Sequence, residues 1–311
     1  MRTSSMLLVG LAACAVDGGR MRAGERDEMI RVNLTTASAP EIAALERAFE
    51  RRNPGHGLCW RPALTALPPA ANARVLLVQS GSAAVAGREV EAEREIGVGD
   101  AVVVRPGEAI AFSAPIGALE FTLPEAPAAA VPQLIRPDQD PRITDTPGGC
   151  ATDVGAYRRV LLTWLGENGP YTFHDLNVHR VRIDDSFTHY HPKDGGFDEF
   201  YLVQAVRPGA RILTSSRTAE IVQPESIARD DVADLLQSTE LAVGDLVYLP
   251  RGVAHRGLGG VLAQVITVPG FVPGAEIGLD HHLQAINERF GLGGADALPL
   301  HAAGAHRAIV R

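Results

Sequence analysis

The chain has 311 residues, of which 46% are hydrophobic, and it carries a formal net charge of −8. This length suits one large or two ordinary domains, and the hydrophobic share is sufficient for a packed core. The negative charge and the lack of basic patches interleaved with aromatic residues argue against a nucleic-acid-binding protein. No apolar run of about 18 residues is present, so the sequence predicts no membrane-spanning helix.

Residues 1–28 allow two interpretations. The first expectation is a start codon assigned too early, with translation from Met21 or Met29, which gives a cytoplasmic protein. The alternative rests on the short apolar stretch before Cys14, which ends in Leu-Ala-Ala-Cys and resembles a bacterial lipoprotein signal. In that case a lipid on Cys14 would anchor the protein.

Residues 29–123 are expected to form the first domain. Ser38, followed two residues later by a proline, predicts the start of a helix, because serine is a common N-cap and proline fits the first turn. The run Asn53-Pro54-Gly55 predicts the end of that helix. Apolar runs in the second half of the domain predict strands.

A proline-rich stretch, residues 124–150, predicts an extended linker to a second domain at residues 151–292. In this second domain the apolar spacing predicts a short amphipathic helix at 228–237 and a closing helix at 276–290. The Ala- and Gly-rich tail, residues 293–311, is expected to be loosely ordered.

The second domain contains four potential metal ligands in two stretches. His189, His191 and Glu199 lie close together, and His255 lies in a later stretch. A strand would point the first two histidines to the same face, because side chains alternate along it. Imidazole with carboxylate suits Fe, Mn, Ni, Cu or Zn rather than Ca or Mg. The sequence therefore predicts one site for a divalent transition metal.

These two stretches resemble the two signature motifs of the cupin superfamily. The first motif, a His-x-His followed by a Glu, is matched by His189, His191 and Glu199. The second motif is matched in full by Gly244, Pro250, Gly252 and His255. The resemblance implies a double-stranded β-helix, or jelly roll, with one metal ion held inside the barrel by the three histidines and the glutamate.

The sequence departs from the family pattern in three places. Ile183 stands where the first motif begins with glycine, and Gly259 stands where the second often has asparagine. Glu199 follows the second histidine at a longer spacing than usual, which leaves Asp194 and Asp198 as alternative carboxylate ligands. Glu199 is favoured because it begins an apolar run, and a ligand on a strand is held more firmly than one on a loop.

The first domain repeats the second motif in a weaker form. Gly99–Val104, followed by Arg-Pro-Gly, parallels Gly244–Leu249, but Ile110 takes the position of His255. No His-x-His occurs before residue 170. We therefore expect an all-β fold with two tandem cupin barrels and a few short flanking helices, in which only the second barrel binds metal.

Tyr201 and His179 are the candidate catalytic residues. Tyr201 lies two residues after Glu199 and would share its face of the strand. His179 lies on the preceding strand, whose polar face would line a pocket or face solvent. Further candidates for the pocket are Tyr190, Arg211 and Tyr248.

A metal with open coordination positions allows several reactions. The leading hypothesis is a dioxygenase that uses Fe²⁺ to oxidise a small organic substrate, with Mn²⁺, Zn²⁺ or Ni²⁺ as alternative cofactors. A metal-dependent isomerase or decarboxylase, or a barrel that only binds a small molecule, are the alternatives. A homodimer is expected, because a partner subunit commonly covers exposed sheet faces and edges.

Overall fold

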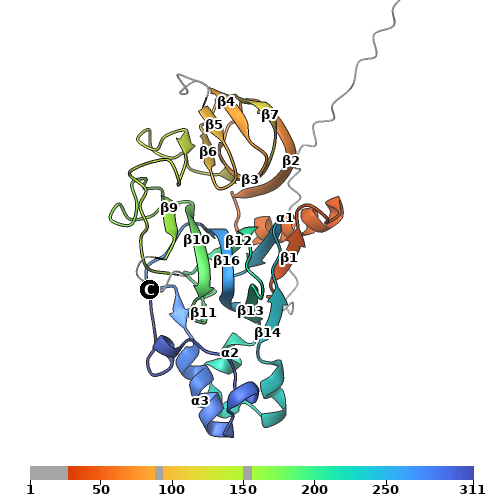
Figure 1. Cartoon of the computed structure of the whole chain (residues 1–311), viewed down its shortest axis with the longest axis vertical. Helices are drawn as coiled ribbons and strands as arrows, with labels where there is room; N and C mark the ends of the chain where they lie inside the picture. Colours follow the sequence, from red (N-terminus) through yellow and green to blue (C-terminus); the bar gives the residue numbers. More distant parts are fainter. Residues whose placement is uncertain (1–26, 88–93, 150–155) are drawn as a thin grey trace, which may run out of the picture.

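The structure of the protein, a computed structural model, describes residues 27–87, 94–149 and 156–311. In these ranges the chain forms two antiparallel sheets, one of seven and one of ten strands, and each sheet curls upon itself (Figure 1). The predicted all-β jelly-roll class is confirmed. The predicted signal or early start falls almost wholly outside these ranges. Within them, no helix has the length and apolar character needed to cross a membrane.

The smaller sheet is formed by residues of the first predicted domain and, in its last strand, of the predicted linker. Its strands are β2 Gly57–Leu67, β3 Ala73–Ser80, β4 Ala83–Gly87, β5 Arg94–Ile96, β6 Ala101–Val104, β7 Ile110–Leu123 and β8 Leu134–Ile135. They run in the order β5-β4-β7-β3-β6-β8, and β2 pairs with β7. The central strand β3 has a nearly continuous apolar run, and its burial on both faces follows from that composition.

The larger sheet carries both motifs. Its strands are β1 Ile30–Asn33, β9 Arg158–Leu162, β10 Asn177–Asp185, β11 His189–Tyr190, β12 Asp198–Ala205, β13 Arg211–Ser215, β14 Gln237–Glu240, β15 Asp245–Leu249, β16 Ala254–Val268 and β17 Ile277–Gly278. The main order is β1-β15-β12-β16-β10-β9. The long strand β16 also pairs with β11 and β13, so it connects the segments that hold the motif residues.

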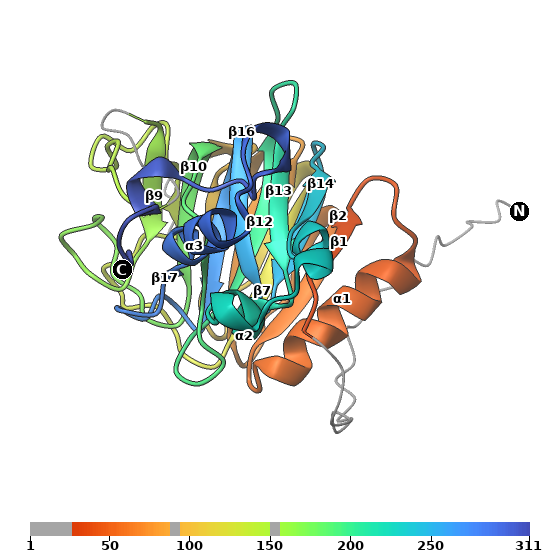
Figure 2. The same cartoon turned by 90° about the horizontal axis from the view of Figure 1, so that it is seen from below.

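The first strand of the chain belongs to the larger sheet, although the sequence places it in the first domain. β1 pairs with β15, with Ile30 opposite Tyr248. Helix α1 (Ala39–Arg52) follows and begins after Ser38, as predicted. In Figure 2, α1 lies at the side of the strands, whereas α3 (Asp280–Phe290) lies across the end of the larger barrel.

The largest apolar cluster lies between the two sheets. Phe49 of α1, Phe121 of β7 and Phe200 of β12 meet there edge to face, with ring centroids 5.3 to 5.9 Å apart. Separate apolar clusters fill the inside of each curled sheet, around Val265 in the larger and Ile110 in the smaller. The two barrels and α1 therefore share one core.

Two helices differ from the sequence predictions. The segment predicted as a helix at 228–237 forms a 3-10 helix, η2 (Arg229–Asp234), and then enters β14. The predicted closing helix begins at Asp280 rather than Glu276, because β17 pairs with β11 instead of continuing the helix. The remaining helices are α2 Thr218–Ile221, η1 Pro224–Ser226, η3 Gly294–Asp296 and η4 Ala302–Gly304.

Residues 293–311, which the sequence predicts to be loosely ordered, pack against the larger barrel. The amide of Gly278 donates to the carbonyl of Ile309 at 2.7 Å, and Ile277 bridges to Val310. The free edge of β17 supplies these backbone partners. This edge is only two residues long, so the local sequence gives no strand signal for it.

Candidate metal centre

Four side chains from three strands and the loop after one of them converge inside the larger barrel. His189 lies on β11, His191 directly after it, Glu199 on β12 and His255 on β16, where it pairs with His189. Their ligand atoms all lie within 4.8 Å of one another, and all four side chains are buried. The two sequence motifs therefore close on a single point.

Two imidazole rings of this cluster are oriented by backbone carbonyls. The Nδ1 atoms of His189 and His255 lie 3.1 and 3.2 Å from the carbonyl oxygens of Phe187 and Val253. A carbonyl only accepts, so each Nδ1 carries the hydrogen and each Nε2 keeps its lone pair for a ligand. The Nε2 atom of His255 lies 3.2 Å from a carboxylate oxygen of Glu199.

Burial sets the charge of the cluster. It lowers the pKa of His255 to about 4 and lowers the pKa values of His189 and His191 as well. It raises the pKa of Glu199 to about 7, against the smaller lowering effects of His189 and of a hydrogen bond from Tyr201. The imidazoles are thus neutral, and their Nε2 atoms are buried without a hydrogen-bond partner. One divalent cation would satisfy the whole donor set.

The alternative carboxylates lie elsewhere. Asp194 is exposed on the loop between the two parts of the first motif. Asp198 is buried, but its oxygens accept hydrogen bonds from Arg251, Asn53 and Tyr248. The structure therefore brings Glu199 to the histidines and neither aspartate.

The two predicted catalytic residues both lie on strands of the larger barrel. Tyr201 is fully buried, and its ring centroid lies 6.3 Å from that of His255. His179 lies on β10, on the same face as the core residue Val181. Burial lowers its pKa well below the usual value, with a smaller contribution from Arg158, and neither ring nitrogen has a hydrogen-bond partner.

The other predicted pocket residues lie away from the cluster. Tyr190 packs against the apolar cluster of α3, and Arg211 is exposed. Tyr248 belongs to the core between the sheets, where its hydroxyl donates to Asp198 at 2.6 Å. Strand alternation explains why Tyr248 lies outside the barrel: its neighbour Leu249 packs in the interior of the larger sheet, and adjacent residues point to opposite faces.

Glu276 is a residue that the sequence analysis does not single out. Its side chain is buried, Oε2 has no hydrogen-bond partner, and burial raises the pKa of its carboxyl while nearby His189 lowers it. It directly precedes β17, which pairs with β11 at His189. Two phenylalanines pack against the histidines of the cluster. The ring centroid of Phe187 lies 4.5 Å from that of His189, and the ring centroid of Phe197 lies 3.9 Å from that of His191.

The smaller barrel has an apolar interior where the larger one has its cluster. Ile110, in the motif position of His255, is 2% exposed and packs in the core of the smaller sheet. Over the described ranges, the four residues of the larger barrel are the group of histidines, cysteines and acids that is arranged to hold a metal ion.

Comparison with known proteins gives matches in structure alone. No protein-family model matches the chain, and no curated protein sequence matches it. The chain is similar to a Bacillus subtilis oxalate decarboxylase with Mn(II) centres, at 11% identity and a TM-score of 0.48, covering 91% of this chain and 89% of that one. It is also similar to AerE from Microcystis aeruginosa, at 8% identity and a TM-score of 0.40, covering 68% and 86%.

Proposed function

We propose that this chain, which has the fold and the three-histidine, one-glutamate cluster of a cupin, is a metal-dependent enzyme acting on a small organic substrate. The observation that carries the proposal is the convergence of four buried ligand atoms within 4.8 Å. Buried polar atoms without partners are rare and costly, and a divalent transition metal supplies what these atoms lack.

Oxidation of the substrate, with Fe²⁺ as the first cofactor, is the leading reaction, and Mn²⁺, Zn²⁺ and Ni²⁺ suit the same donors. A bound metal supplies a Lewis acid and open positions for substrate and O₂. The carbonyls of Phe187 and Val253 orient His189 and His255 so that their Nε2 atoms would face the metal. Phe197 lies against the third imidazole and shields it from water.

Proton transfer, as in an isomerase or decarboxylase, is the second candidate, and one observation favours it. His179 and Glu276 are both buried, and each has polar atoms without a hydrogen-bond partner. Burial lowers the pKa of His179 and raises that of Glu276. A carboxyl with a raised pKa holds a proton that it can donate, whereas the lowered pKa of His179 makes its imidazole a weak base that would accept a proton only transiently.

Elemental analysis of the purified, untagged protein tests the proposal. We expect about one Fe, Mn, Ni or Zn per chain, and none in a His189→Ala/His191→Ala double variant. His174→Ala, at an exposed position, is the matched control and should keep the metal. Substrate-dependent O₂ uptake by the loaded protein separates oxidation from proton transfer. Absence of metal even after reconstitution leaves a small-molecule-binding barrel as the function.

Three further expectations from the sequence stay predictions. These are the division at residues 29–123 and 151–292, the homodimer, and the cytoplasmic location. Light scattering tests the dimer: a particle of twice the chain mass of 33.0 kDa supports it, and a particle of one chain mass contradicts it.

A further inference from the structure

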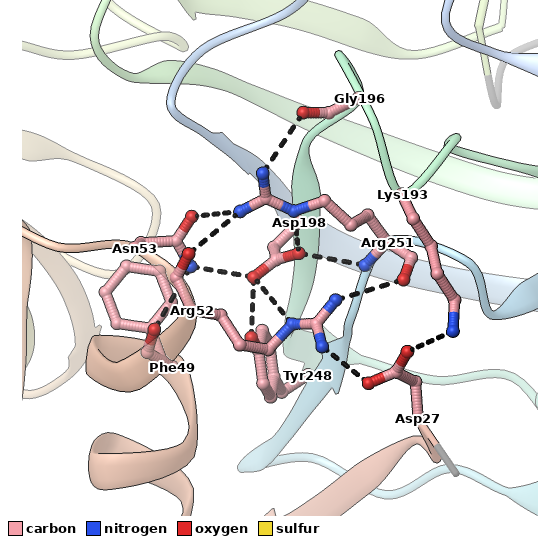
Figure 3. Close-up of polar contacts among 9 residues, drawn as sticks. All are labelled: Asp27, Phe49, Arg52, Asn53, Lys193, Gly196, Asp198, Tyr248 and Arg251. Carbon is pink, nitrogen blue, oxygen red and sulfur yellow. Dashed lines mark hydrogen bonds and ion pairs between the residues drawn. The ribbon is translucent and has the colours of Figure 1, made fainter. Parts of the chain in front are cut away.

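A buried carboxylate lies back to back with the glutamate of the cluster. Asp198 precedes Glu199 on β12, so the two side chains point to opposite faces of the strand. Glu199 faces the three histidines, and Asp198 faces the end of α1 (Figure 3). Asp198 is completely buried. Its Oδ1 accepts from the backbone amide and Nε of Arg251 at 2.8 and 2.9 Å. Its Oδ2 accepts from Nδ2 of Asn53 at 2.7 Å and from the Tyr248 hydroxyl at 2.6 Å.

Asp198, Asn53 and Arg251 form a closed ring, which we call the Asp198 ring. Besides the bonds to the carboxylate, Nη2 of Arg251 donates to Oδ1 of Asn53 at 2.6 Å, so each member is bonded to the other two. Arg52 reinforces the ring, with its Nε 3.6 Å from Asp198 and its Nη2 donating to the Arg251 carbonyl at 3.1 Å. The hydrogen bonds to Asp198 offset part of the free energy that it costs to bury its charge.

The turn that contains Arg251 also holds two of the candidate ligands. The amide of Gly252 donates to the carbonyl of His191 at 2.7 Å. The carbonyl of Val253 accepts from Nδ1 of His255 at 3.2 Å. The Asp198 ring therefore joins the strand of the glutamate to the turn that positions two histidines.

The loop between the two parts of the first motif is tied to the same place. Lys193 pairs with Asp27 at 2.7 Å, and Asp27 pairs with Arg52 (Figure 3). The stem of Lys193 lies over Gly252, where an added Cβ would meet the lysine Cε at 2.7 Å and where φ is +97°. The positive φ favours glycine at this position, because it has no Cβ.

We propose that Asn53, at the end of helix α1, is a positioning residue for the metal centre. Through Asp198 and Arg251 it holds β12 and the 250–253 turn at the separation that the four ligands need. The inference rests on the metal centre proposed above. Asn53 lies 145 residues before Asp198, so the metal affinity of the second barrel depends on a helix from the first predicted domain.

Titration of the metal-free protein with Mn²⁺ measures this dependence. Groups that orient metal ligands from outside typically affect metal affinity 10- to 100-fold, so we expect Asn53→Ala to raise the Kd by about tenfold or more. Glu41→Ala is the matched control: it removes two hydrogen bonds to Ser38 at the other end of α1. Both variants should lower Tm, but Glu41→Ala should leave the Kd within about twofold of the wild-type value. The visible spectrum of bound Co²⁺ should change in Asn53→Ala alone.

An exchange of the two side chains gives a second test that does not depend on a truncated residue. Asp198→Asn removes the charge opposite Arg251, and Asn53→Asp places two carboxylates together, so each should raise the Kd. The double variant restores one amide and one carboxylate and should bind Mn²⁺ more tightly than either single variant.

Three results would overturn the inference. One is a wild-type Kd and Co²⁺ spectrum in Asn53→Ala. Another is an equal rise of the Kd in Glu41→Ala, because affinity would then merely follow stability. The third is a double variant, Asn53→Asp with Asp198→Asn, in which the rise in the Kd equals the combined rises of the two single variants. A wild-type protein that binds neither Mn²⁺ nor Co²⁺ overturns the metal centre itself, and the inference with it.

Discussion

His255 is the residue on which the cluster converges. Its ring centroid lies 4.2 Å from that of His189 and 5.2 Å from that of His191, and its Nε2 faces Glu199. We expect His255→Ala to lose most of its metal and to keep its fold. Glu199→Gln should lose less, because three imidazoles remain. Elemental analysis after dialysis checks both variants, and full metal content in His255→Ala, or the reverse order, would contradict the ligand set.

Glu199 makes metal binding depend on pH. The pKa of its carboxyl is raised to about 7 and that of His255 is lowered to about 4, in both cases by burial. Below pH 7 a proton must leave Glu199 before metal binds, whereas His255 is already neutral. As the pH falls from 7 to 5, the apparent Kd for Mn²⁺ should therefore rise about tenfold per pH unit.

The same titrations above pH 7 provide the check on this assignment. There the carboxylate is already ionised, so the Kd should be constant. In Glu199→Gln the slope below pH 7 should disappear. A Kd that continues to fall with increasing pH in the wild type would assign the proton to another group.

The three histidines could be singled out from the sequence because each lies at the spacing of a known motif, whereas Glu199 lies at a longer spacing than its motif has. The apolar run after Glu199 favours it over Asp198 in the sequence, and the structure adds the contacts of both carboxylates, which are adjacent and buried. What separates them is strand alternation combined with partners that are remote in sequence, above all Asn53. Glu276 could not be predicted, because its importance depends on the folding of the two-residue strand β17 against β11.

At the scale of elements, strand β7 of the smaller barrel carries an apolar core residue at the motif position where the larger barrel has His255. The strand begins at Ile110, which is buried in the apolar interior. We expect Ile110→Ala to lower the free energy of unfolding by about 2–4 kcal/mol through the cavity it leaves. Urea unfolding measures this loss. The metal content should not change, and loss of metal would mean that the barrels share a site.

Element types were more predictable than element partners. The start of α1 after Ser38 and the apolar strands follow from local sequence. The pairing of β1 with β15 does not, because four residues near the start of the chain carry no mark of a partner in the other half. The segment at 276–290 was predicted too long for a similar reason, since its first residues have a strand partner available.

At the scale of the whole molecule, the shared core predicts that both barrels unfold together. Phe49 touches Phe121 of one sheet and Phe200 of the other. We expect Phe49→Ala to cost about 3–5 kcal/mol and to lower one common Tm. Trp60 and Trp164, used one at a time as fluorescent reporters after replacement of the other by Phe, check this. Different midpoints for the two reporters would show independent barrels.

The pairing of β1 with β15 cannot form until most of the chain has been synthesised on the ribosome. The first strand leaves the ribosome long before its partner, with 214 residues separating Arg31 from Asp245. At about 5–20 residues per second, this strand waits roughly 10–40 s. The smaller sheet can form during that interval, because all its strands precede residue 136. During this interval the newborn protein carries an unpaired strand, and the smaller sheet exposes the apolar face that later packs in the shared core, so both are surfaces that a chaperone could bind.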